Sequence, residues 1–239
     1  MSEYQYNDLT MEEYERRKRE RAKARELRAK RRRLIKRVCI AALAVIIIAA
    51  AVILITRPHK DRDRDTDIVE VLAEAKIPSW IDKQIIASGS SSRQGGKLSG
   101  MTAIVVHYVG SPGTTAQQNR DYYDQPGTKT SSHFIVGLDG EVIQCLPLDE
   151  KASATGKRNG DTISIEVCHT DENGEFTGKA YDSLVKLTAW LCKLCELDPD
   201  GGVIRHYDAT GVKCPPYYVE HEDAWKALIE DVTAAMPKK

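Results

Sequence analysis

Two side chains that bind soft metal ions lie near the C-terminal end of the chain: His206 and Cys214, in the segment VIRHYDATGVKCPP (203–216). An imidazole and a thiolate together favour zinc, and a catalytic zinc ion usually has three protein ligands and one water. The two residues are eight positions apart, whereas side chains that meet on one helix are three or four apart. The spacing favours a loop that leaves a strand at His206, bends at Gly211 and returns the thiolate to the same ion.

A third ligand must come from another segment. The best candidate is His107, which ends the apolar run MTAIVVH. A single His and a single Cys in a loop are more often ordinary side chains than ligands, so on spacing alone that alternative stays open. If His107, His206 and Cys214 meet, they form a zinc site with one open position for water.

A carboxylate that could work beside such an ion lies in the segment TISIEVC. Side chains alternate between the two faces of a strand, so Glu166 shares a face with Thr162 and Ser164, opposite the branched apolar residues. Burying a glutamate in the middle of such a strand costs folding free energy unless its carboxylate has a partner or a catalytic role. The alternative is a partly exposed glutamate on the polar face of the strand.

One α/β domain must position these residues. Apolar strands such as AIVV fit a sheet that is covered by helices on both sides, and Asp139-Gly140 predicts a hairpin turn. The run SGSSSRQGGKLSG (88–100) is loop material by composition. The sequence predicts strands at 102–107, 132–137, 142–146, 162–168 and 203–206. It predicts helices at 115–123, 181–195 and 220–235.

The N-terminal part of the chain predicts a membrane anchor. Residues 38–55 form an apolar run of eighteen residues without charge, Gly or Pro, and a helix of that length spans about 27 Å, close to the roughly 30 Å hydrocarbon core of a bilayer. Residues 1–37 carry fourteen Lys and Arg against seven Asp and Glu, and such basic flanks stay in the cytoplasm. We therefore predict a single-pass cell-membrane protein with a cytoplasmic segment 1–37, a transmembrane helix 38–55, a stalk 56–76 and an extracellular domain 77–239.

Two other interpretations of this region are less favourable. A cleaved signal peptide usually has a shorter basic head, and no small-residue cleavage site follows Ile55. The basic head could bind nucleic acid in principle, but the interleaved acids and the adjacent apolar run favour the membrane, so we expect no nucleic-acid partner. Cys192 and Cys195, on a predicted helix face, are expected to be small apolar core residues.

Four segments together carry a family resemblance. They are IVVHYVGSPGTTAQQN, SSHFIVGLDGEVIQCLPLDE, RNGDTISIEVCH and VIRHYDATGVKCPP, in this order. They resemble the zinc-dependent N-acetylmuramoyl-L-alanine amidases of the phage lysozyme and peptidoglycan-recognition superfamily (type 2 amidase domains), most of all those from anaerobic Gram-positive bacteria and their phages. The resemblance covers residues 77–239. It implies an α/β fold with a single mixed central β-sheet flanked by helices, here preceded by one transmembrane helix.

The resemblance also implies a reaction and its residues. It implies that His107, His206 and Cys214 bind Zn²⁺ and that zinc-activated water hydrolyses peptidoglycan, at the amide between the lactyl group of N-acetylmuramic acid and the L-alanine of the stem peptide. Glu166 occupies the position of the glutamate in the family's I-x-I-E motif, which implies a general acid/base. An outward-facing domain on an anchor would lie where Gram-positive wall lies, so peptidoglycan and the membrane are the expected partners.

This chain departs from the family pattern at two positions. Relatives usually carry a lysine two residues before the zinc cysteine, where it can stabilise an oxyanion, whereas this chain has Val212 there and Lys213 directly before Cys214. In extended backbone a shift of one residue turns a side chain to the other side, so Lys213 is only a candidate oxyanion stabiliser. Phage relatives also carry a tyrosine where this chain has Ser132; its role is expected to be absent or taken by another residue such as Tyr108.

The remaining polar candidates have weaker assignments. His133 is of the right type for a ligand, but the equivalent family position is not one, so we expect a cleft-lining or buried, hydrogen-bonded role. His169, His221 and His59 are expected to be ordinary surface or loop residues. Asp208 is a candidate to orient a ligand imidazole, since ligating histidines usually donate their other N–H to an acceptor.

Two further functions remain open at this point. The first is a peptidoglycan-binding module of the same fold without turnover. Non-catalytic members of the superfamily typically lose the zinc cysteine, so Cys214 favours the enzyme, while the displaced Lys213 keeps the binding module open. The second is a zinc hydrolase of other amides, such as a peptidase.

Overall fold

The computed structural model describes residues 60–176 and 178–237, with side chains from residue 67 onward. The basic segment 1–37 and the predicted span 38–55 lie outside this range. No helix within the described part of the chain is long and apolar enough to cross a membrane.

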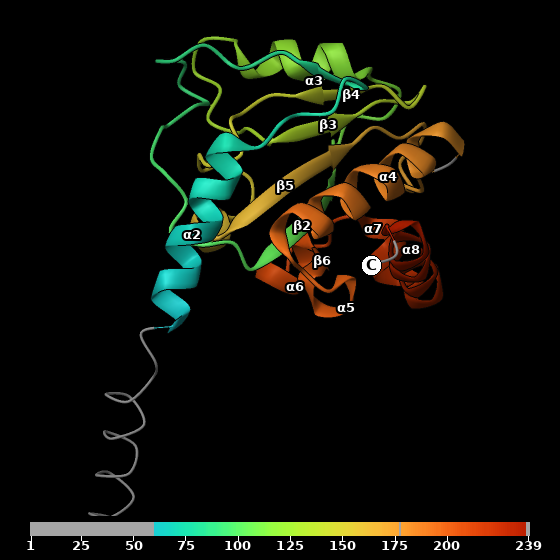
Figure 1. Ribbon diagram of the computed structural model, residues 1–239. Coiled ribbons are helices and arrows are strands. Elements are labelled where there is room, and N and C mark those ends of the chain that lie inside the picture. Colours follow the sequence, from blue (N-terminus) through green and yellow to red (C-terminus); the bar gives the residue numbers. More distant parts are fainter. Residues whose placement is uncertain (1–59, 177, 238–239) are drawn as a thin grey trace, which may run out of the picture. The chain divides into compact units, whose positions relative to one another are not determined.

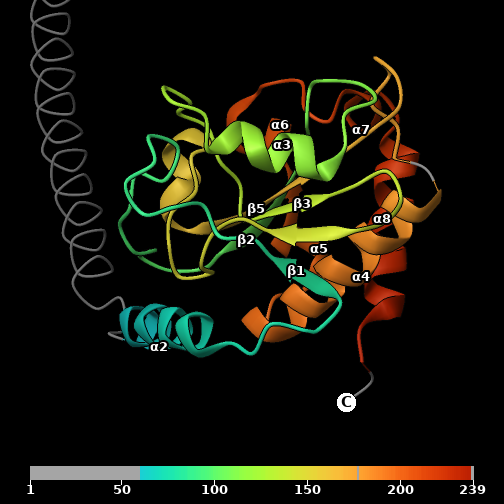
Figure 2. The same cartoon turned by 90° about the horizontal axis from the view of Figure 1, so that it is seen from above.

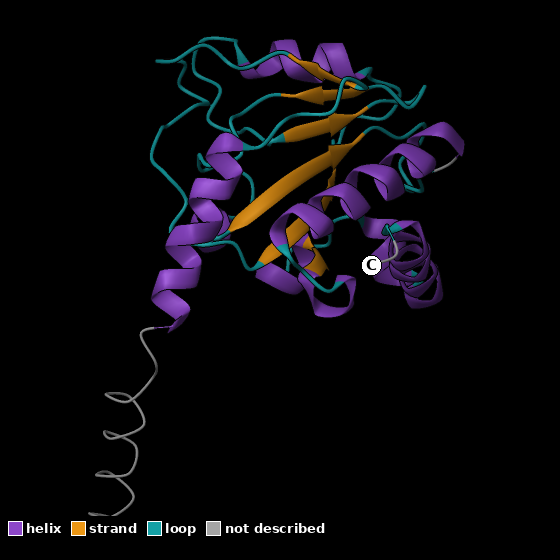
Figure 3. Ribbon diagram, in the orientation of Figure 1, coloured by secondary structure: helices purple, strands orange, loops and turns teal. Residues whose placement is uncertain are grey.

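Six strands form one mixed sheet in the order β1-β4-β3-β5-β2-β6 (Figures 1 and 3). Only the β3–β4 pair is antiparallel among the strand pairs of the described chain. The strands are β1 (Ile81–Lys83), β2 (Ala103–Tyr108), β3 (Phe134–Val136), β4 (Val142–Gln144), β5 (Thr162–Val167) and β6 (Val203–Arg205). The predicted α/β class with a mixed central sheet is therefore confirmed. Strand β2 has its predicted length but begins one residue later, the other four predicted strands are shorter than predicted, and β1 was missed.

Helices cover both faces of the sheet (Figure 2). They are α2 (Lys60–Glu74), α3 (Ala116–Tyr123), η1 (Gly156–Gly160, a 3₁₀ helix), α4 (Gly178–Cys195), α5 (Pro199–Gly202), α6 (His206–Thr210), α7 (Pro216–Glu220) and α8 (Glu222–Ala235). The predicted long helices α3, α4 and α8 are confirmed, while the short helices α5, α6 and α7 were not predicted. Helices of one turn offer too few residues for a periodic apolar pattern.

Strand alternation separates two apolar cores. Phe134 and Val136 face a large core that includes the α4 residues Leu184 and Leu187. Ile135, between them, faces the smaller core under α3. Both α4 cysteines are buried in the large core, as predicted. The face under α3 is the one that carries the polar residues of β2 and β5.

The segment expected as a stalk, 56–76, contains helix α2 over most of its length. Leu72 of this helix is buried in the large core, and α2 packs against α4. At least this part of the predicted stalk is therefore packed on the domain.

Local sequence explains how helix α3 begins and how strands β3 and β4 are joined. Thr115 starts α3 with a capping box: its side chain accepts from the backbone N–H of Gln118, and the Gln118 side chain accepts from the N–H of Thr115 at 2.9 Å. The predicted hairpin turn lies between β3 and β4, with Gly140 at φ +85°. A Cβ at Gly140 would lie 2.9 Å from the carbonyl oxygen of Lys179, so this turn requires glycine.

Candidate metal centre

Parallel pairing brings His107 and Glu166 together. Strands β2 and β5 are in register with His107 directly opposite Glu166, so both side chains project from the same face. The Nδ1 of His107 lies 3.9 Å from Oε1 of Glu166. The pairing therefore places the candidate base beside the first candidate ligand.

The chain turns back on itself to add the other two candidate ligands. Strand β6 pairs with β2, and His206 follows it as the first residue of α6, not as the last residue of a strand as predicted. Gly211 ends α6 with φ 80° in the left-handed region, which confirms the predicted bend. The return is closed by a backbone hydrogen bond of 3.0 Å from the N–H of Tyr207 to the carbonyl oxygen of Cys214.

The three predicted ligand residues meet, and they are the candidate metal-binding group of the described chain. One ligand atom from each of His107, His206 and Cys214 lies within 4.8 Å of the other two. The Sγ of Cys214 is 3.9 Å from Nδ1 of His107, and the two imidazole rings have centroids 4.4 Å apart. Tetrahedral zinc with bonds of roughly 2.0–2.3 Å holds its ligand atoms about 3.3–3.8 Å apart, so the donor set fits zinc after a small contraction.

Burial favours the neutral form of both histidines. It lowers the pKa of His107 to about 3, with a further contribution from nearby His206, and it also lowers the pKa of His206. His107 is almost fully buried and His206 is half-buried. Neutral imidazoles are the form that binds a metal.

Cys214 needs a cation to ionise. Burial and the nearby carboxyl of Glu166 raise the pKa of the Cys214 thiol to about 12, against a hydrogen bond from the backbone N–H of Tyr108 that favours the thiolate. A thiol of this kind is protonated at neutral pH unless a metal ion replaces the proton. The chemistry of the donor set therefore fits a zinc ion.

Glu166 is the one carboxylate placed to exchange protons beside this group within the described chain. Its side chain is 15% exposed, and Oε2 is buried without a hydrogen-bond partner among the described residues. Burial raises its pKa to about 8. A carboxyl that takes and releases a proton near neutral pH has the property of a general acid/base.

The structure places Lys213 away from the ligands. Its Nζ pairs with the carboxylate of Glu220, and both side chains are more than half exposed. This ion pair lowers the pKa of Glu220. Val212, at the position of the family lysine, is 53% exposed.

The expected role of His133 is confirmed. The side chain is fully buried, its Nδ1 accepts a hydrogen bond from the backbone N–H of Ser164 at 3.0 Å, and its Nε2 donates to the carbonyl oxygen of Glu150 at 2.8 Å. Burial lowers its pKa to about 4. Both ring nitrogens are engaged, so His133 supports the sheet.

The candidate role of Asp208 is corrected, and the loop assignment of His169 is met although the residue is buried. The carboxylate of Asp208 does not orient a ligand, because it bonds the guanidinium of Arg205 at 2.9 and 3.0 Å and the Arg205 backbone N–H at 2.9 Å. A carboxylate beside an arginine on the same turn is held there by charge. His169 follows β5 in a loop but is 1% exposed, packed against the ring of Tyr108 at 5.0 Å. His221 is exposed as expected, and His59 lies outside the described residues.

Two polar contacts at the site were missed by sequence reasoning. Thr155 places Oγ1 3.3 Å from Nε2 of His107. The buried hydroxyl of Tyr123, from α3, lies 3.0 Å from Oγ of Ser132, so Ser132 has a tyrosine hydroxyl as its hydrogen-bond partner. Thr155 lies 48 residues from His107, and Tyr123 lies nine residues before Ser132 in a different segment, so no helical or strand spacing predicts either pair.

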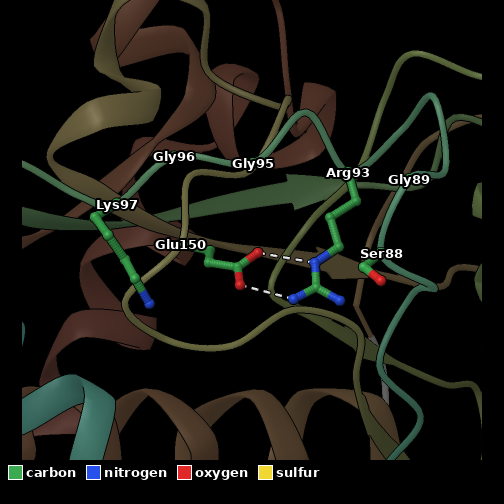
Figure 4. A pocket seen from close by; sticks show the side chains of 7 residues that line it. All are labelled: Ser88, Gly89, Arg93, Gly95, Gly96, Lys97 and Glu150. Carbon is green, nitrogen blue, oxygen red and sulfur yellow. Dashed lines mark hydrogen bonds and ion pairs between the residues drawn. The ribbon is translucent and has the colours of Figure 1, made fainter.

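A separate hollow of about 220 Å³ lies along the 88–97 loop (Figure 4). Arg93 and Glu150 face each other in it with two hydrogen bonds of 2.8 and 2.7 Å, so their charges neutralise each other. It is lined by Ser88, Gly89, Arg93, Gly95, Gly96, Lys97 and Glu150. None of the candidate ligands is among these lining residues, and we assign no ligand to it.

Comparisons with known proteins agree with this geometry. The model of the Amidase_2 family, described as N-acetylmuramoyl-L-alanine amidase, matches residues 97–217. The amidase BlyA of Bacillus subtilis (strain 168) is 29% identical over 168 residues, which cover 62% of this chain and 45% of BlyA. The amidase CwlL of Bacillus licheniformis is 29% identical over 176 residues, which cover 66% of this chain and 48% of CwlL. The chain thus spans about half the length of these curated relatives.

A solved structure gives the same picture. The catalytic domain of XlyA superposes with a TM-score of 0.55 at 28% identity, over 64% of this chain and 98% of that domain. The matched region therefore corresponds to a whole catalytic domain in that protein.

Proposed function

Because the chain belongs to the Amidase_2 family of N-acetylmuramoyl-L-alanine amidases, we propose that it is a zinc-dependent peptidoglycan hydrolase. It cleaves the amide between the lactyl group of N-acetylmuramic acid and the L-alanine of the stem peptide. The observation that carries the proposal is the meeting of His107, His206 and Cys214 within 4.8 Å, with Glu166 beside them. Both curated relatives are named N-acetylmuramoyl-L-alanine amidases, which supports this amide as the substrate bond.

The metal ligands and Glu166 have different roles in the proposed reaction. His107, His206 and Cys214 hold the ion, which when bound supplies Lewis-acid activation of water and of the scissile carbonyl. Glu166 takes a proton from the attacking water at its carboxylate and delivers it to the leaving nitrogen as the carbon–nitrogen bond breaks. The products are the free lactyl carboxylate and a stem peptide with N-terminal alanine.

The test uses purified full-length protein on Gram-positive sacculi. We expect one zinc per chain and the release of new N-terminal alanine, both lost with a chelator and both restored by zinc. Zinc without hydrolysis would favour the alternative, a non-catalytic peptidoglycan-binding module. The observation in favour of that alternative is that Lys213, the candidate oxyanion stabiliser, pairs with Glu220. Other new N-terminal residues would indicate a peptidase, and absence of zinc would refute the metal site.

We further propose that residues 38–55 anchor the protein with the hydrolase domain outside the cell. The proposal rests on the apolar run and its basic flank. We expect the protein to sediment with membranes after carbonate washing and its domain to be cleaved by protease added to wall-free cells. If the domain is protected from protease in wall-free cells whose membrane is intact, this topology is wrong.

The Lys213→Ala substitution tests the shifted lysine. An oxyanion donor is worth on the order of 100-fold or more in rate, but Lys213 is engaged with Glu220, so we propose a lesser contribution and expect a loss of roughly tenfold or less. The measurement is kcat for alanine release, with the exposed Lys179→Ala as the control. A loss as large as that of Glu166→Gln would mean that Lys213 leaves Glu220 and reaches the oxyanion.

A further inference from the structure

Thr155 is the polar neighbour of the ligand His107 on the side away from the other ligands. Its Oγ1 lies 3.3 Å from Nε2 of His107. Thr155 is fully buried and His107 is 2% exposed. Among the described residues, no other group lies within hydrogen-bonding distance of this nitrogen.

The two nitrogens of His107 face different partners. Nδ1 lies 3.9 Å from Sγ of Cys214 and 3.9 Å from Oε1 of Glu166, so it is the nitrogen that faces the candidate metal centre. A neutral imidazole that offers the Nδ1 lone pair carries its proton on Nε2. Because Nε2 is buried, that proton needs an acceptor, and Thr155 Oγ1 provides it.

The backbone of Thr155 is itself held in place. Oδ1 of Asn159 accepts hydrogen bonds from the backbone N–H of Thr155 at 2.6 Å and from that of Ala154 at 3.2 Å. Asn159 belongs to η1, which begins directly after Thr155. The backbone two residues before Thr155 is held as well, because Ser153 and Ser131 exchange backbone hydrogen bonds of 3.2 and 3.3 Å.

We propose that Thr155 is a positioning residue for the metal centre, fixing the Nε2–H tautomer and the ring orientation of His107. The hydrogen bonds from the backbone of Ala154 and Thr155 to Asn159 keep Thr155 in the position that this role requires. The inference rests on the proposed zinc site and goes beyond it, since it names the group that prepares one ligand before the metal binds. Removal of such a partner typically weakens metal affinity by about 10–100-fold.

The matched variants are Thr155→Val, which keeps the shape but cannot accept a hydrogen bond, and Thr155→Ser, which keeps the hydroxyl. Thr188→Val is the control, because Thr188 is equally buried and its hydroxyl has no partner within the described chain. Zinc affinity of the full-length protein is measured by competition with a chromophoric chelator. We expect Thr155→Val to bind zinc about 10–100-fold more weakly, and Thr155→Ser and Thr188→Val to bind it as the wild type does.

A second measurement needs no substitution. Long-range ¹H–¹⁵N spectra of zinc-loaded, ¹⁵N-histidine-labelled protein should show His107 with a proton on Nε2. A proton on Nδ1, or unchanged affinity in Thr155→Val, would overturn the inference while leaving the zinc amidase intact. A wild type that binds no zinc would instead overturn the proposed function, and this inference with it.

Discussion

Replacement of Cys214 by serine is expected to abolish zinc binding and hydrolysis together. The thiolate is the one anionic ligand of the group, and serine offers a neutral hydroxyl that is a poor replacement for it. The side chain is 5% exposed, so water has little access to take its place. We expect zinc content to fall from one per chain to a small fraction, and alanine release to fall to background.

The readouts for Cys214→Ser are metal analysis after dialysis and alanine release from sacculi. Cys195→Ser is the control, since Cys195 is a buried thiol of α4 in the large core and is not among the three candidate ligands. It separates loss of a metal ligand from loss of a buried sulfur. Stoichiometric zinc in Cys214→Ser would refute the ligand assignment, whatever the activity.

Glu166→Gln is expected to lose turnover while it keeps normal zinc content and a normal fold. The amide has the shape of the carboxylate but cannot take a proton from water or pass it to the leaving nitrogen, and general acid–base catalysis contributes about 10²–10⁴-fold. Burial raises the pKa of Glu166 to about 8. A bound cation would favour its ionised form, which is the form that a general base needs.

The Glu166→Gln test compares kcat, zinc content and thermal unfolding with those of the wild type. An exposed glutamate on α8 provides the control, Glu230→Gln, which should match the wild type in all three. A rate for Glu166→Gln within a few-fold of wild type would remove Glu166 from the mechanism. Loss of zinc in the same variant would show instead that the carboxylate supports the metal directly.

The alternation of strands explains why much of this site could be predicted from the sequence. The apolar run before His107 and the pattern TISIEVC assign each residue to a face, because side chains on a strand alternate with a period of two. The turn at Gly211 is likewise local, since glycine is favoured at φ 80°. The residue types and the family resemblance therefore named the three candidate ligands and Glu166, and strand pairing accounts for the meeting of His107 with Glu166.

The contacts that hold Lys213 and Asp208 away from the site depend on which charged neighbour each side chain meets. Lys213 pairs with Glu220 because α7 brings that carboxylate within reach, and Asp208 turns to the guanidinium of Arg205. Charge selects the partner in both cases: Asp208 pairs within its own turn, whereas the partner of Lys213 depends on where α7 lies.

By itself, the sequence determined which residues could bind zinc and exchange protons, and which strand face each of the strand-borne candidates occupies, because these are properties of residue type and of a two-residue period. Only the tertiary structure decided that the ligand atoms of His107 and Cys214, 107 residues apart, lie 3.9 Å from each other, and that Thr155 lies behind His107. The physical reason is that register and loop closure are set by the packing of the whole sheet, not by any one segment.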